Sequence, residues 1–89
     1  MKLIFCSECY DLRRLDLCRE TRCNCGESFG KYVEGIHAIY GGKAIPIGIA
    51  NSTLVSALQQ RELWNKQTGV DFKAFVIPST CKTFEKIDK

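Results

Sequence analysis

Six cysteines stand out in this chain of 89 residues, and four of them form two close pairs. Cys6 and Cys9 form a C-x2-C pair, and Cys23 and Cys25 form a C-x-C pair that Gly26 follows directly. A pair of cysteines on a tight turn can present two thiolates to one metal ion, while nearby backbone N–H groups hydrogen-bond to the sulfur atoms. The spacer is long enough for a hairpin that brings the pairs together. The pattern therefore predicts one tetrahedral Zn²⁺ site with four thiolate ligands.

The other cysteines leave alternatives open. Cys18 lies between the two pairs, five residues before Cys23, and could replace one ligand. Cys81 stands alone near the C-terminus, where we expect a free thiol that is buried or partly exposed. Disulfides explain the pattern less well than a metal does, because a bridge within a C-x-C pair is strained and no secretory signal is evident.

Residues 5–26, which read F-C-S-E-C-Y … R-C-N-C-G, resemble a zinc ribbon, although the second pair has C-x-C where the commonest pattern has C-x2-C. The resemblance covers about a quarter of the chain and implies metal binding without fixing a role, because zinc ribbons bind DNA, RNA or proteins, or only stabilise a fold. The remainder, with Gly30–Tyr32 and Ala44–Ser52, is similar to small uncharacterised zinc-ribbon proteins of bacteria and their phages. That similarity supplies no activity by itself, but a compact phage protein of this sort could sequester a host nucleotide or inhibit a host protein.

Composition and charge narrow the class of protein. A chain of this length with 45% hydrophobic and 26% charged residues predicts a single soluble globular domain with a thin core. Its formal charge of +3 falls to about +1 once four thiolates and one Zn²⁺ are counted, which excludes nucleic-acid coating by bulk charge. No stretch resembles a signal peptide or a membrane span, so we expect a cytoplasmic protein.

The elements that must position the cysteines are short. Alternation predicts a strand near residues 14–17, and a hairpin formed by strands over 32–40 and 44–50 with a turn at Gly41 and Gly42. A helix over 53–65, a strand over 72–77 and an edge strand at 83–84 follow. We expect Leu54, Ala57, Leu58 and Trp64 to face the core. The fold class predicted is α+β, a single domain over 1–89 with a zinc ribbon over 1–32 and a hairpin, helix and strand over 33–89.

The residues of this chain give little support for a catalytic function. Four thiolates would close the coordination sphere of the metal, whereas a catalytic zinc keeps one position for water. His37 is the single histidine, and a catalytic pair with Cys81 would require the fold to bring them together. A hydrogen-bonded structural histidine is the simpler interpretation. We therefore expect a protein that is not an enzyme.

Ligand binding is the remaining class of function, and two sets of residues could contact a ligand. One set is Asn51, Ser52 and Thr53, which follow Gly48 and lead into the predicted helix, whose free N–H groups favour an anion. The other set comes from the ribbon and comprises Arg22, Lys31 and Tyr32. Plain helix capping and a mixed-charge solvated surface explain the same residues. The partner expected is a phosphate-bearing ligand, either a nucleotide or a nucleic acid. The alternative is a protein partner with no small ligand, and a homodimer is compatible with both.

Overall fold

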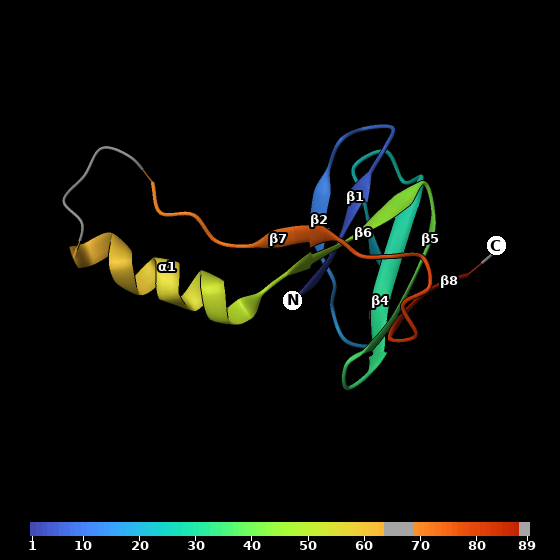
Figure 1. Ribbon diagram of the computed structural model, residues 1–89. Coiled ribbons are helices and arrows are strands. Elements are labelled where there is room, and N and C mark those ends of the chain that lie inside the picture. The colour runs from blue at the N-terminus through green and yellow to red at the C-terminus, as the bar shows by residue number, and fades with distance from the viewer. Residues whose placement is uncertain (64–68, 88–89) are drawn as a thin grey trace.

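The computed structural model describes residues 1–63 and 69–87, and most of its regular structure is β-strand. In chain order the elements are β1 (Lys2–Cys6), β2 (Leu12–Arg14), β3 (Thr21–Arg22), β4 (Ser28–Glu34), β5 (His37–Gly42), β6 (Ala44–Ile49), α1 (Asn51–Leu63), β7 (Ala74–Val76) and β8 (Phe84–Lys86). The strands form two four-stranded sheets, in the orders β2-β1-β6-β7 and β3-β4-β5-β8 (Figure 1). The α+β class predicted from the sequence is therefore wrong, and the protein is a small β-rich domain with one helix among the described residues.

The core lies between the inner faces of the two sheets. Phe84 is fully buried and meets the ring of Tyr40 edge to face, with 4.9 Å between ring centroids. The buried residues that pack around this pair come from both sheets and their connections: Ile4, Leu15, Ala38, Ala44 and Ile77. Because β1 pairs with β6, strands from residues 1–32 and 33–89 share one sheet.

The predicted hairpin between residues 32–40 and 44–50 does not form. The hairpin that does form joins β4 to β5, and its turn falls at Gly35 and Ile36. Gly41 and Gly42 belong to β5, and the chain then crosses through Lys43 into the other sheet. The glycine pair is needed for close packing: a Cβ on Gly41 would overlap the Phe29 ring, and one on Gly42 would overlap the backbone of Glu27.

Among the remaining strands, β1 and β3 were not predicted, and the others have bounds that differ from the predicted ones. The strand predicted near residues 14–17, between the two cysteine pairs, is instead Leu12–Arg14 and pairs with β1. Leu15 is buried in the core. The strand predicted over 72–77 shortens to β7, which pairs antiparallel with β6. The edge strand predicted at 83–84 is β8, which runs parallel to β5.

The helix begins two residues earlier than predicted, at Asn51, and the part predicted beyond Leu63 lies outside the described residues. The carbonyl oxygen of Ala50 accepts hydrogen bonds from the backbone N–H groups of Thr53 and Leu54. In Figure 1, α1 follows β6 and extends away from both sheets. Of the helix residues predicted to face the core, Ala57 is buried and Leu54 is partly buried, whereas Leu58 is 50% exposed. Among the described residues, no helix has the length and apolar character to cross a bilayer.

Candidate metal centre

The two cysteine pairs come together, as the sequence predicts. The sulfur atoms of Cys6, Cys9, Cys23 and Cys25 all lie within 4.8 Å of one another. The Cys25 sulfur is 3.7 Å from that of Cys6 and 3.5 Å from that of Cys23. Four sulfurs at about 2.3 Å from a central Zn²⁺ would be about 3.8 Å apart at the edges of the tetrahedron. All six cysteines are free thiols in the structure, so this cluster can hold a metal ion without competition from a disulfide.

Each pair sits on a turn with a left-handed residue. The first turn leaves β1 at Cys6, whose carbonyl oxygen accepts from the N–H of Tyr10, a residue with φ of +60°. The second turn lies between β3 and β4, where the N–H of Gly26 bonds to the carbonyl oxygen of Cys23 and φ of Gly26 is +80°. Glycine adopts this conformation without strain. The first cysteine pair therefore comes from one sheet, and the second pair comes from the other.

Two connections hold the turns against each other. The backbone carbonyl oxygen of Asp11 accepts a hydrogen bond from the Cys6 N–H at 2.9 Å. The Asp11 carboxylate accepts a second one from the Asn24 backbone N–H, also at 2.9 Å. Lys43 pairs with Glu8 at 2.7 Å between Nζ and Oε1. The Lys43 backbone N–H also donates to the carbonyl oxygen of Glu27, at 2.9 Å. These contacts join the two turns that carry the cysteine pairs.

The thiols differ in how readily they ionise. Desolvation by burial opposes ionisation of Cys23, but the backbone N–H of Ser28 and the neighbouring thiols lower the pKa of Cys23 to about 6. The backbone N–H of Glu27 favours a thiolate at Cys25, but desolvation and the adjacent sulfurs raise the pKa of Cys25 to about 12. Four thiolates at this separation repel one another, so the last of them ionises only when a cation offsets their charge. The donor set therefore suits a dication with high affinity for sulfur.

Ser28 provides a further test of whether a metal fits. Its hydroxyl is fully buried and has no hydrogen-bond partner among the described residues. It nevertheless lies beside Cys6, where it is the largest influence that lowers the pKa of that thiol. Backbone N–H groups of Glu8 and Ser28 already approach the sulfurs of Cys6 and Cys23, at 3.4 and 3.3 Å. A metal-bound Cys6 thiolate would accept a bond from the Ser28 hydroxyl and so satisfy it.

Replacement of Ser28 by alanine is expected to weaken zinc binding about ten-fold, because hydrogen bonds to the ligating atoms orient them and stabilise their charge. Competition with a chromophoric chelator measures the affinity. The exposed Ser79→Ala variant is the matched control and should bind zinc as the wild type does. Equal affinities in the wild type and Ser28→Ala would show that the hydroxyl does not support the thiolates.

Cys18 and Cys81 lie outside the cluster. Cys18 is exposed, has φ of +59°, and directs its sulfur toward the carbonyl oxygen of Val33. Cys81 is partly buried against the core, and its sulfur lies 3.3 Å from the Thr83 hydroxyl. That hydroxyl and the Thr83 backbone N–H lower the pKa of Cys81.

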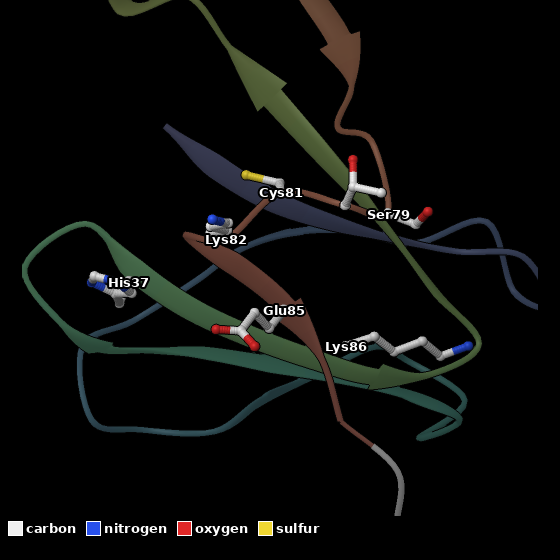
Figure 2. A pocket seen from close by; sticks show the side chains of 7 residues that line it. His37, Ser79, Cys81, Lys82, Glu85 and Lys86 are labelled. Atoms are coloured by element: carbon white, nitrogen blue, oxygen red, sulfur yellow. The ribbon is translucent and has the colours of Figure 1, made fainter.

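His37 and Cys81 border one open pocket of about 590 Å³, a proximity that their positions in the sequence did not reveal (Figure 2). The other residues that line the pocket are Ser79, Thr80, Lys82, Glu85 and Lys86. His37 begins β5 and is exposed, whereas Cys81 lies on the connection before β8. Among the bonds of the described residues, none joins the imidazole to the thiol.

The residues predicted to bind a ligand at the start of α1 already have partners within the chain. The Asn51 side-chain oxygen accepts from the amino group of Met1 at 2.8 Å. The Thr53 hydroxyl donates to the Ala50 carbonyl oxygen at 2.7 Å and accepts from the Lys73 backbone N–H at 2.9 Å. Ser52 is exposed. The side chains of Asn51 and Thr53 thus secure the junction of β6, α1 and the segment that returns to β7.

The predicted basic residues of the ribbon lie on the second sheet. Arg22 pairs with Glu20 at 2.9 Å, and its guanidinium lies over the Phe29 ring, 5.2 Å from the centroid. Lys31 is half-buried in β4. The Tyr32 hydroxyl accepts a bond from the backbone N–H of Lys2, which joins the two sheets.

Comparison with known protein families, with curated proteins and with solved structures finds no match to this chain. The functional argument therefore rests on the cluster itself and on the surfaces around it.

Proposed function

We propose that this chain is a small non-enzymatic binding protein in which Cys6, Cys9, Cys23 and Cys25 hold one structural Zn²⁺. The observation that supports it is the sulfur cluster, whose separations of 3.5 and 3.7 Å are close to the edges of a zinc–thiolate tetrahedron. Four protein ligands leave no position for a reacting water, so the role proposed for the ion is structural. Since the two pairs belong to turns of different sheets, the ion would tie the sheets together.

For the ligand, we propose a phosphate-bearing molecule, a nucleotide or nucleic acid, at the start of α1. The side chains of Asn51 and Thr53 have partners within the chain, so the contact would come from the exposed Ser52 and from backbone N–H groups. Arg22, Lys31 and Tyr32 of the ribbon are the second place where phosphate could bind.

Titration calorimetry on zinc-loaded protein, with a panel of nucleotides and a short oligonucleotide, tests this proposal. A Ser52→Glu variant should bind at least about ten-fold more weakly, because its carboxylate repels an anion at the helix start. Ser56→Glu places the same charge on an exposed position one turn later and should bind as the wild type does. Undiminished binding by Ser52→Glu would move the site to the ribbon. No binding by the wild type would reject the phosphate ligand and favour a protein-interaction adaptor.

A further inference from the structure

The four cysteines of the cluster differ in how much of each is exposed to solvent. Cys6 and Cys23 are buried, at 0% and 6% exposure, whereas Cys9 is partly exposed and Cys25 is exposed. The cluster therefore has an inner side that solvent does not reach and an outer side that it does. Because oxidation of a thiolate requires access to its sulfur, a reagent in solution meets Cys25 first.

A cavity of about 550 Å³ opens on the outer side of the cluster. Cys9 and Cys25 line it together with Glu8, Glu27 and Lys43. Each cysteine pair thus contributes one residue to the wall of the cavity. Its volume is more than ten times the roughly 30 Å³ that a water molecule occupies in the liquid, so a small solute can approach both cysteines.

The charges around this cavity favour a neutral solute over an anion. Glu8 and Glu27 each carry a negative charge, and the ammonium group of Lys43, which pairs with Glu8, carries one positive charge. Four thiolates and one Zn²⁺ would add two further negative charges. The local net charge of about −3 repels anions and leaves the approach of a neutral molecule unhindered.

Cys25 also has a second thiol within reach. Its sulfur lies 3.7 Å from the Cys6 sulfur and 3.5 Å from the Cys23 sulfur. A disulfide within the C-x-C pair is strained, which favours Cys6, on the other turn, as the partner of an oxidised Cys25. An accessible thiolate beside a thiol that can form a disulfide with it is the arrangement found in redox-sensing cysteines.

We infer that Cys25 is the site at which a small neutral peroxide, such as hydrogen peroxide, opens the zinc centre; the inference rests on the zinc site proposed above. The Cys25 thiolate attacks one peroxide oxygen, the O–O bond breaks, and hydroxide leaves, which gives a sulfenic acid. The Cys6 thiolate then attacks the Cys25 sulfur, the S–O bond breaks, and a second hydroxide leaves. The two sulfurs together lose the two electrons that the peroxide gains.

The disulfide leaves Cys9 and Cys23 as the remaining thiolate ligands of the cluster. Two ligands hold Zn²⁺ far more weakly than four, so the ion is released. Because metal binding and folding are linked, the two turns then separate and the fold is lost. A thiol reductant reverses the oxidation by thiol–disulfide exchange, after which zinc can bind again.

Peroxide titration of a zinc-loaded Cys18→Ser/Cys81→Ser double variant tests the inference, because this background retains only the thiols of the cluster. One equivalent of peroxide should release one equivalent of zinc to a chromophoric indicator. Mass mapping of the digested product should identify a Cys6–Cys25 disulfide, and dithiothreitol with added zinc should restore the circular dichroism spectrum. A disulfide between other members of the cluster would overturn the inference.

Limited alkylation of the zinc-loaded wild type with iodoacetamide, a neutral electrophile, tests whether exposure directs the reaction. Cys25 should be labelled at least about ten-fold faster than Cys23, which belongs to the same turn but is buried. Equal rates of labelling at these two cysteines would contradict an attack that begins on the outer side of the cluster.

A charge reversal at the cavity tests the preference for a neutral oxidant. Glu27→Lys should speed zinc release by dithiodiglycolate, a disulfide with two carboxylates, on the order of ten-fold at low salt, and leave the rate with peroxide unchanged. Glu34→Lys makes the same change at the far end of β4 and is the matched control. An unchanged rate with the disulfide in Glu27→Lys would contradict selection of the oxidant by charge.

The zinc content before treatment separates this inference from the proposed function. Folded protein without zinc would reject the metal site and the inference together. Zinc that is bound at the start and stays bound under excess peroxide would reject the inference alone.

Discussion

Replacement of Cys23 by serine is expected to abolish tight zinc binding and leave the chain largely unfolded. Cys23 is buried, and it belongs to the turn that must meet the first cysteine pair. A structural zinc contributes on the order of 10 kcal/mol to folding, which exceeds the total stability that a small core ordinarily provides. Far-ultraviolet circular dichroism and zinc content, measured on the purified variant, should both show the loss.

The two cysteines outside the cluster provide the controls for this variant. Cys81→Ser and Cys18→Ser should retain zinc and lower the free energy of unfolding by about 1 kcal/mol or less, since neither thiol reaches the cluster. If Cys23→Ser remained folded with full zinc content, or if Cys18→Ser lost its zinc, the ligand set would be different from the one proposed here.

Gly42→Ala is expected to lower the free energy of unfolding of the zinc-loaded protein by about 3 kcal/mol. Gly42 has φ of +69°, and a Cβ there would overlap the carbonyl oxygen of Glu27, in the turn that carries the second cysteine pair. The same oxygen accepts a bond from the Lys43 N–H, so a shift of Glu27 would disturb both the turn and the crossing between sheets. Urea denaturation at saturating zinc measures the change.

Gly35→Ala separates the steric contact from backbone strain. Gly35 also has a positive φ, of +48°, but an added Cβ there would meet no atom within 4 Å. That variant should lose about 1 kcal/mol, which is the ordinary cost of a left-handed residue other than glycine. Equal losses in the two variants would contradict the close packing of Gly42 on Glu27.

The cysteine cluster was predictable because the information is local. Two short spacings identified Cys6, Cys9, Cys23 and Cys25, and the fold brings these four sulfurs together. Supporting contacts were not predictable, since Ser28 carries no motif and approaches Cys6 only when β4 folds beside β1. The proximity of His37 and Cys81 likewise depends on the parallel pairing of β8 with β5, which no local pattern signals.

The arrangement of the sheets was predicted poorly for a physical reason. Two consecutive glycines usually mark a turn, but Gly41 and Gly42 are glycines because Phe29 and Glu27 pack closely against them. The true turn, at Gly35 and Ile36, was hidden within a run that alternates like one strand. The helix was predictable from the sequence. Periodicity alone could not show that Leu58 is exposed rather than packed in the core.

X-ray absorption spectroscopy at the zinc edge tests the central claim most directly. For protein loaded with one equivalent of Zn²⁺, the proposed site predicts a single shell of four sulfur atoms at about 2.3 Å. Fewer than four sulfurs, or a shell that contains nitrogen or oxygen, would contradict a closed site formed by Cys6, Cys9, Cys23 and Cys25.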